Sequence, residues 1–169
     1  PDKKHKQSDG EGHFLISSRD LHRRDIHEVN TLLRWIGNSV PLAAHRFSNP
    51  NPSKYNYEDY LPLSDNGGGK YNFNINAFKL VHCWCVFYRK GDCVEPHNHF
   101  PYSLSFCYYI DTPEGSSPLI VDDEEINVKQ GQVVFFPSNS FHSVPPCSVD
   151  GRCAIVGNMW AESTFNETA

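Results

Sequence analysis

The sequence lacks any apolar run of the roughly 18 to 20 residues that cross a bilayer. It also lacks a basic excess, because 15 Lys and Arg stand against 20 Asp and Glu, for a formal net charge of -5. Residues 1–12 hold no apolar stretch of the kind found in signal peptides. These absences argue against membrane or nucleic-acid binding. We therefore expect a cytoplasmic protein whose partner is a small-molecule or peptide substrate.

The sequence also lacks the clustered cysteine pairs of a structural zinc site. A lone C-x-C, formed by Cys83 and Cys85, has no second pair beside it. Residues i and i+2 of a strand share a face, so these two cysteines are also poorly placed for a disulfide with each other. The set is even in number but lies mostly in apolar, strand-like runs (Cys83, Cys85, Cys93, Cys107, Cys147, Cys153). We expect reduced, buried cysteines rather than disulfides.

The length of 169 residues suits one domain. We expect a flexible segment over residues 1–16 and a single jelly-roll domain over residues 17–169. A helix is predicted over about residues 18–36, where Ser17 and Asp20 resemble a capping box and Gly37 supplies the end. Its apolar stripe follows the i, i+3, i+4, i+7 pattern (Val29, Leu32, Leu33, Ile36). Residues 41–70 are rich in Pro, Asn, Tyr and Gly and are predicted to be loop.

Residues 71–160 have β character. Short apolar runs rich in β-branched and aromatic residues alternate with turn residues, and no helical pattern lies between them. The pattern predicts about eight strands (77–88, 93–99, 103–110, 119–121, 126–130, 133–136, 142–144 and 152–160), with a polar turn at 122–125. The predicted fold class is mainly β, an antiparallel sandwich or barrel of jelly-roll type, with the N-terminal helix against an outer sheet face.

Three histidines are the candidate metal ligands. His97 and His99 are one residue apart, so a strand directs both to one face, which is the inside of a small barrel in the right register. His142 follows a second apolar segment, which begins at Gly131 and contains Pro137. Three neutral imidazoles form a face for a divalent transition metal and leave positions for substrate and O2.

Residues 78–158 resemble the double-stranded β-helix core of the iron(II)- and 2-oxoglutarate-dependent oxygenases. The resemblance rests on Pro96-His-Asn-His-Phe-Pro101 and on Phe136-Pro-Ser-Asn-Ser-Phe-His-Ser-Val-Pro145. It is greatest to a group of small oxygenases with a P-H-x-H-x-P segment. The resemblance implies an enzyme that holds Fe(II) through His97, His99 and His142. Such an enzyme takes 2-oxoglutarate as co-substrate and hydroxylates a substrate that the sequence does not identify.

The same resemblance implies a role for Arg152. The family has an arginine about ten residues beyond the distal histidine, which binds the 5-carboxylate of 2-oxoglutarate, and Arg152 lies ten residues after His142. A guanidinium is the natural clamp for a planar carboxylate; the alternative is a surface arginine after a turn. A tyrosine hydroxyl often shares that carboxylate, and Tyr88 and Tyr108 are the predicted partners. Further candidates are Tyr109, Tyr102 and Ser105.

Two departures from the oxygenase pattern keep other functions open. His99 stands where the family has Asp or Glu, and the R-x-S after the clamp reads Arg152-Cys153-Ala154. The chain also resembles the cupins, whose G-x5-H-x-H motif is met from Gly91, although Asn139 replaces a motif glycine and the later glutamate is absent. The alternatives are a three-histidine cupin-type dioxygenase that does not use 2-oxoglutarate and a non-catalytic jelly-roll binding module.

Three further predictions concern residues around the motifs. His82 and Trp84 are expected on an outer face, without a catalytic role. Glu95 is expected to be a solvated turn residue, the alternative being a residue that orients a ligand. A homodimer through an outer sheet face or the helix is compatible with the pattern, although no specific residue indicates one.

Overall fold

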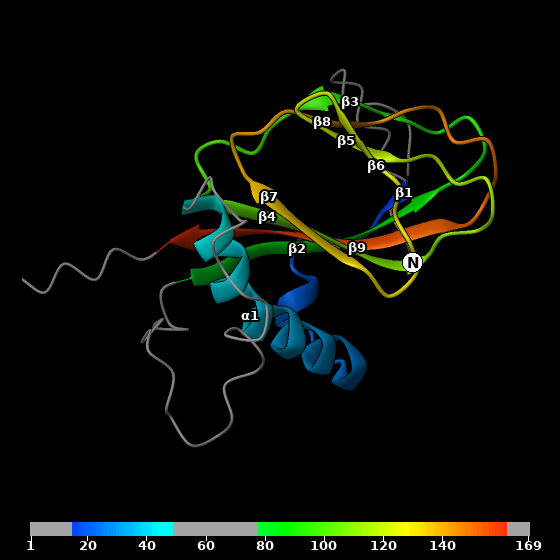
Figure 1. Ribbon diagram of the computed structural model, residues 1–169. Helices are drawn as coiled ribbons and strands as arrows, with labels where there is room; N and C mark the ends of the chain where they lie inside the picture. The colour runs from blue at the N-terminus through cyan, green and yellow to red at the C-terminus, as the bar shows by residue number, and fades with distance from the viewer. Residues whose placement is uncertain (1–14, 49–77, 162–169) are drawn as a thin grey trace, which may run out of the picture.

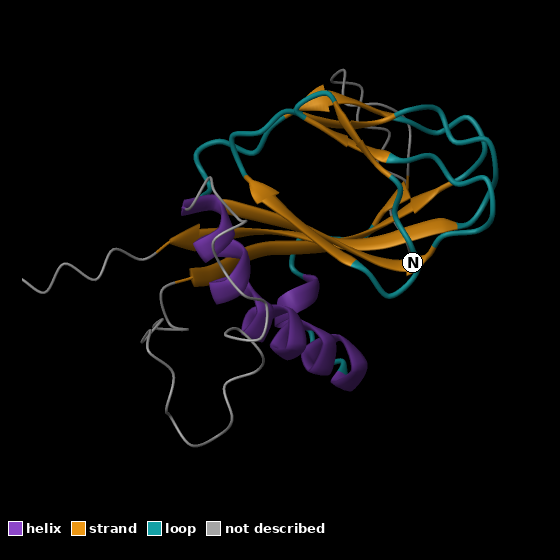
Figure 2. Ribbon diagram, in the orientation of Figure 1, coloured by secondary structure: helices purple, strands orange, loops and turns teal. Residues whose placement is uncertain are grey.

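The computed structural model describes residues 15–48 and 78–161, which form two facing antiparallel sheets and one long helix (Figures 1 and 2). This confirms the predicted mainly β fold with an N-terminal helix. Within these residues no helix is long and apolar enough to span a bilayer. The strands are β1 (Leu15–Ile16), β2 (Phe78–Tyr88), β3 (Val94–His97), β4 (Leu104–Asp111), β5 (Leu119–Val121), β6 (Glu124–Ile126), β7 (Val133–Pro137), β8 (His142–Val144) and β9 (Arg152–Ala161).

The larger sheet has the order β1-β2-β9-β4-β7 and the smaller one β3-β8-β5-β6. The long strands β2 and β9 form the middle of the larger sheet and pair from Phe78 opposite Ala161 to Tyr88 opposite Arg152. Consecutive residues of a strand face opposite sides, so every second residue of β2, β4 and β9 points between the sheets. The side chains that meet there form an apolar core that includes Val86, Cys107 and Phe136.

The outer face of the larger sheet is covered by helix α1 (His27–Ser48), as Figure 1 shows. Ile36 and Val40 of the helix pack in one buried cluster with Cys83, Ile155 and Met159 of the sheet. The prediction that the helix covers an outer sheet face is thus confirmed. The helix places an apolar layer beneath the sheet and leaves the space between the two sheets to the functional side chains.

The predicted helix bounds were wrong. The chain forms a short 3-10 helix, η1 (Leu21–Arg23), and then α1 from His27 through Gly37 and Pro41 to Ser48. The apolar stripe continues beyond Ile36 to Val40 and Ala43, both buried, and their packing continues the helix although an internal glycine costs roughly 1 kcal/mol and an internal proline roughly 3 kcal/mol. Ser17 does not cap the helix, because its hydroxyl oxygen accepts a hydrogen bond from the backbone N–H of Cys85.

The loop predicted over residues 41–70 is helical to Ser48, and residues 49–77 lie outside the described residues, as do residues 1–14 of the segment predicted to be flexible. The strand predicted at 126–130 is instead β6, Glu124–Ile126. The hairpin turn consists only of Asp122 and Asp123, both with positive φ (48° and 69°). Aspartate tolerates this left-handed conformation, so a tight two-residue turn forms and pairing resumes at Glu124.

All six cysteines lie within the described residues and are free thiols. Cys83, Cys107 and Cys147 are buried among apolar side chains. Burial raises the pKa of the Cys83 and Cys107 thiols to about 12, so neither is a reactive thiolate at neutral pH. These thiols therefore serve as small apolar side chains of the core, in the way the sequence predicts.

Candidate metal centre

The three histidines predicted as metal ligands come together at one end of the space between the sheets. His97 ends β3 and His142 begins β8, and the two residues are register partners in the smaller sheet. His99 follows in the adjoining loop, where its backbone N–H donates to the carbonyl of Ser138 at 2.7 Å. The loop is therefore fixed to the end of β7, and two segments about forty residues apart in sequence present three imidazoles to one point.

Two glycines make this arrangement possible. Gly91 and Gly131 lie in the turns before β3 and β7, with φ of +85° and +79°. Nothing lies within 4 Å of a Cβ added at either position. The preference for glycine in both motifs is therefore conformational, since glycine adopts this backbone region without the strain that most other residues meet there.

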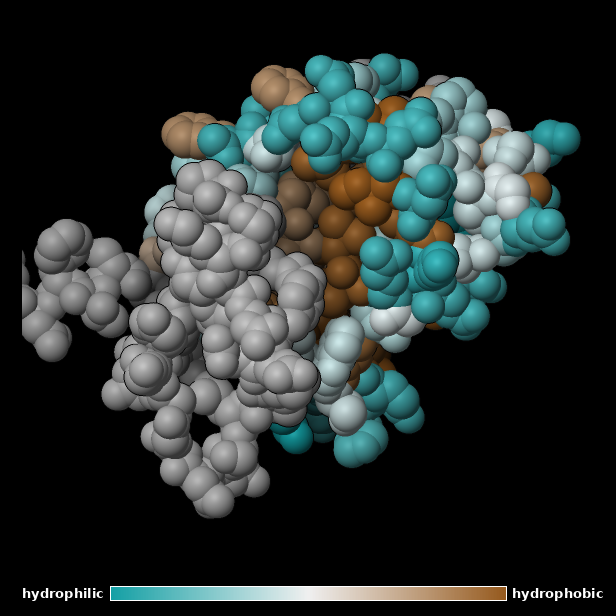
Figure 3. All heavy atoms as spheres, in the orientation of Figure 1, coloured by the Kyte–Doolittle hydropathy of each residue, from teal (hydrophilic) through white to brown (hydrophobic). Residues whose placement is uncertain are grey.

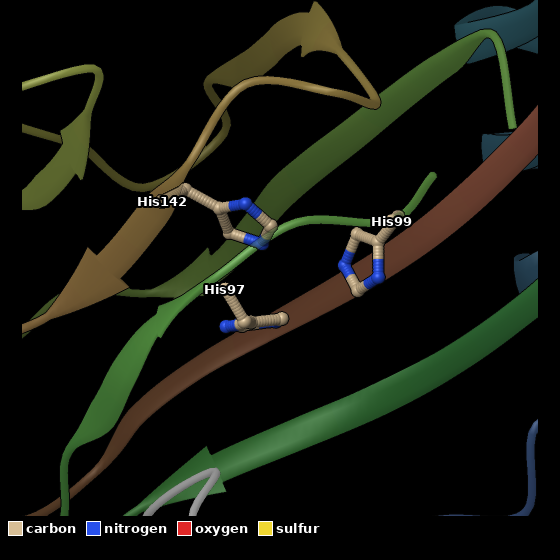
Figure 4. Close-up of side chains that lie close together, drawn as sticks. All are labelled: His97, His99 and His142. Carbon is tan, nitrogen blue, oxygen red and sulfur yellow. The ribbon is translucent and has the colours of Figure 1, made fainter. Parts of the chain in front are cut away.

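The three side chains point toward one another, as Figure 4 shows. One nitrogen from each ring lies within 4.8 Å of the others. The ring centroids are 5.0 Å apart for His97 and His99, 4.3 Å for His97 and His142, and 4.8 Å for His99 and His142. Nitrogens that share a metal lie about 2.0–2.1 Å from it and so at most about 4.2 Å from one another, which a small inward movement of the rings would reach. The geometry fits one divalent ion held on one face by three nitrogens.

Backbone carbonyls orient two of the imidazoles. His97 Nδ1 lies 2.9 Å from the carbonyl oxygen of Glu95, and His142 Nδ1 lies 3.3 Å from that of Ser140. A ring that donates from Nδ1 keeps the lone pair of Nε2 free, and this is the usual way in which a histidine ligand is oriented. Glu95 lies on β3, so the turn position predicted for it was wrong, whereas the predicted exposure of its carboxylate is confirmed.

The surroundings keep two of the rings neutral. Burial, together with the neighbouring His142 and His97, lowers the pKa of His99 to about 3. Burial, together with His97, lowers the pKa of His142 to about 4. A metal binds only the neutral imidazole, so these two ligands are ready for a metal at neutral pH without first losing a proton.

The cluster opens onto a cavity that runs between the two sheets. Figure 3 shows apolar side chains gathered in this region, with hydrophilic residues around it. No Asp or Glu is among the described residues that line the cavity. Its polar lining consists of the three histidines, Arg152, two tyrosines and the Ser105–Asn158 pair, in which Ser105 donates to the Asn158 carboxamide oxygen at 2.9 Å.

Arg152 lies in the same cavity and is one of the most buried residues of the protein, with 1 % of its surface exposed. Its guanidinium carbon lies 4.6 Å from the ring centroid of Tyr88 and 5.2 Å from that of Tyr109. Its Nε has no hydrogen-bond partner, and no carboxylate of the described residues is in ion-pair range. The surface arginine considered as an alternative is thereby excluded.

The predicted tyrosine partners separate into two groups. Tyr88 lines the cavity beside Arg152, as does Tyr109, whose hydroxyl is buried without a well-formed hydrogen bond among the described residues. Tyr108 was wrongly predicted, because it lies on the outer face and meets Trp35 of α1 edge to face at 6.1 Å. Adjacent residues of a strand face opposite sides, so Tyr108 and Tyr109 cannot both reach the site. The Tyr102 hydroxyl bonds instead to His82 Nδ1 at 3.1 Å.

Trp84 and Asn158 also line the cavity, although the sequence did not predict either of them as a site residue. Trp84, predicted on the outer face, points inward and meets the His99 ring at 6.0 Å edge to face. Asn158 is buried. The signal that reveals both is the strand alternation, because Trp84 shares the face of Tyr88 on β2, and Asn158 shares that of Arg152 on β9.

Comparison with known proteins places the chain near two groups of solved structures. No family model and no curated protein matches the sequence. A 2OG-Fe(II) oxygenase family oxidoreductase from Burkholderia pseudomallei aligns at a TM-score of 0.46 with 13 % identity, over 49 % of this chain and 43 % of that one. The viral collagen prolyl hydroxylase of Paramecium bursaria Chlorella virus 1, solved as a 2OG complex, aligns at 0.45 with 14 % identity, over 50 % and 61 %.

The second group is that of the cupins. An RmlC-like cupin from Desulfovibrio desulfuricans aligns at a TM-score of 0.38 with 18 % identity, over 56 % of this chain and 93 % of that one. The chain thus spans about half the length of the two oxygenases and nearly all of this cupin. The described part of the chain is similar to both 2OG-Fe(II) oxygenases and RmlC-like cupins.

Proposed function

We propose that this protein is a non-haem Fe(II)- and 2-oxoglutarate-dependent oxygenase. One observation carries the proposal: the cavity that holds the three histidines also holds Arg152, a buried cation with no carboxylate partner among the described residues. Leaving a buried charge without a counter-ion costs several kcal/mol. An anionic ligand that enters the cavity would supply the missing counter-charge.

The distance between the three histidines and Arg152 suits a ligand that contacts both. Trp84, which contacts His99, is the register partner of Val156 on β9. Val156 and Arg152 are four residues apart on that strand, about 13 Å at 3.3 Å per residue. The imidazoles and the guanidinium are thus separated along the strand, and a small dicarboxylate would have one anionic group for each.

In this proposal the protein supplies the geometry and the electrostatics. His97, His99 and His142 would hold Fe(II) on one face, and Arg152 would bind the far carboxylate of 2-oxoglutarate bidentately. The hydroxyl of Tyr109, which is buried near Arg152 without a well-formed hydrogen bond among the described residues, would donate a second hydrogen bond to that carboxylate. Bound iron and 2-oxoglutarate supply the oxidising chemistry, in which O2 converts the co-substrate to succinate and CO2 and adds one oxygen atom to a C–H bond of the substrate.

Several residues would keep water away from the reacting groups. Trp84 contacts His99, and the ring centroids of Phe136 and His142 are 4.7 Å apart, so aromatic side chains pack against two of the three histidines. A dry site strengthens the attraction between Arg152 and a carboxylate, because the interaction energy rises as the effective dielectric constant falls.

The test is turnover of 13C-labelled 2-oxoglutarate with Fe(II) and O2, followed by NMR. We expect Fe(II)-dependent succinate, reduced at least tenfold in Arg152→Gln because charged hydrogen bonds contribute roughly 1.5–3 kcal/mol each. Arg152→Lys should form succinate at a rate between those of the wild type and Arg152→Gln, since lysine keeps the charge but lacks the planar guanidinium. Arg34→Gln, at an exposed position on α1, is the matched control and should equal the wild type.

A second candidate is the cupin-type dioxygenase, which the three-histidine ligand set favours, since no carboxylate joins the three rings among the described residues. Iron binding without any succinate, and without an effect of Arg152→Gln, would support this candidate and overturn the first. A protein that binds no divalent metal would be a non-catalytic binding module.

A further inference from the structure

A second arginine, Arg19, lies beside the metal centre at the edge of the larger sheet. The segment after β1 continues along β2: Ser17 N–H donates to the carbonyl of Cys85 at 3.0 Å, and Cys83 N–H donates to that of Arg19 at 3.1 Å. These two hydrogen bonds flank Trp84. The backbone of Arg19 is therefore fixed next to the one tryptophan that lines the cavity.

The side chain of Arg19 lies over this tryptophan. Its guanidinium carbon is 5.5 Å from the centroid of the Trp84 ring, and the same indole meets His99 edge to face at 6.0 Å. Stacking on an aromatic face restrains the guanidinium and leaves its N–H donors free. One side chain thus separates an exposed, oriented cation from a candidate metal ligand.

Among the described residues Arg19 has no acidic partner. The adjacent carboxylate, Asp20, lies 3.8 Å from Arg24 instead. No hydrogen bond from the Arg19 side chain to another described residue is present, and the described part of the cavity lining has no Asp or Glu. The donors of Arg19 are available to a ligand at the edge of the cavity.

The charges of the site leave room for a second anion. Three neutral imidazoles do not offset the charge of a divalent metal. The two charges of 2-oxoglutarate would balance Arg152 and half of that metal charge. The remaining metal charge and Arg19 stay uncompensated, and such a field attracts an anionic molecule into the site.

We propose that Arg19 binds the anionic group of the substrate, a carboxylate or a phosphate, and that the substrate is therefore a small anionic molecule. The oxidation of that molecule and the attraction of the metal charge rest on the function proposed above, whereas the direct anion contact rests on Arg19 and Trp84. The guanidinium offers two parallel N–H donors, which suit the paired oxygens of either group. Trp84 contacts both Arg19 and His99, so one indole ring lies between the bound group and the nearest candidate metal ligand.

The experiment uses Trp84 as the reporter. Trp35 and Trp160 are exposed, at 49 % and 42 %, so a Trp35→Phe, Trp160→Phe protein retains Trp84 as its one tryptophan. Sodium phosphate and sodium acetate are titrated separately at constant ionic strength, with Fe(II) and 2-oxoglutarate present under anaerobic conditions. We expect a saturable change in Trp84 fluorescence. The anion that binds more tightly, phosphate or acetate, identifies the group that the substrate carries.

In this background Arg19→Gln should weaken binding of the preferred anion at least tenfold, because a charged hydrogen bond is lost. Arg23→Gln, which removes the same charge from an exposed position on η1, should leave binding unchanged. Equal affinity in wild type and Arg19→Gln, or no saturable binding by either anion, overturns the anion site.

The anion titration is repeated without iron and 2-oxoglutarate, and its result is compared with the succinate assay described above. The two results together separate this inference from the proposed function. If succinate never forms but Arg19→Gln still loses the anion, the anion site stands and the oxygenase proposal falls. If succinate forms normally in wild type and Arg19→Gln, and neither protein binds the anions, the oxygenase proposal stands and the anion site falls.

Discussion

The neutral state of His142 makes a quantitative prediction about acid stability in the metal-free protein. The side chain is buried, and burial together with His97 lowers its pKa from 6.5 to about 4. The unfolded chain then binds a proton more readily than the folded one. The corresponding stability is fully present above pH 6.5 and is lost as the pH falls from 6.5 toward 4. At pH 5 the loss from this residue is about 2 kcal/mol.

The assay is urea denaturation at pH 7.5 and pH 5.0 in the presence of EDTA. Between pH 7.5 and pH 5.0 the free energy of unfolding should fall by about 2 kcal/mol more in the wild type than in His142→Gln, because glutamine does not titrate. His27→Gln, at the exposed first residue of α1, is the control and should lose as much as the wild type. An equal loss in wild type and His142→Gln would refute the reasoning.

Three further predictions follow from the site and its support. A divalent metal at a hundred times its dissociation constant should add about 2.7 kcal/mol, raising the Tm by about 5 to 10 °C, and His97→Gln should abolish most of this rise in a thermal melt. Tyr109→Phe should leave the stability of the metal-free protein unchanged but weaken 2-oxoglutarate binding about tenfold in calorimetry, whereas Tyr108→Phe should bind normally. Gly157→Ala should cost about 1–3 kcal/mol in urea unfolding, since the new Cβ would lie 2.6 Å from Phe106; an unchanged midpoint would contradict that packing.

Most of the β fold could be predicted because its signals are local. Apolar runs bounded by Gly, Pro and Asp lie close to the strands of the structure, and the motif glycines mark the turns before β3 and β7. The first strand, β1, has only two residues, which is too short for a pattern to form. The end of α1 could not be predicted from Gly37, because burial of Val40 against the sheet decides it, and that contact comes from distant residues.

The site, too, could be predicted only where local sequence patterns determine it. The H-x-H spacing and the segment before His142 identify the ligand triad, since strand geometry alone brings His97 and His99 to one side. Choosing Tyr109 over Tyr108 required the register of β4, which adjacent tyrosines do not reveal. Arg19 could not be predicted as a neighbour of Trp84, because the two residues are sixty-five positions apart and meet only through the edge of β2.

The most direct test of the central proposal is the visible spectrum of the protein with Fe(II) and 2-oxoglutarate under anaerobic conditions. Chelation of Fe(II) by the keto acid should produce a weak metal-to-ligand charge-transfer band that saturates with 2-oxoglutarate and requires all three histidines. The band should need at least tenfold more 2-oxoglutarate in Arg152→Gln. Iron binding by the three histidines without this band would contradict the proposal that the cavity holds 2-oxoglutarate.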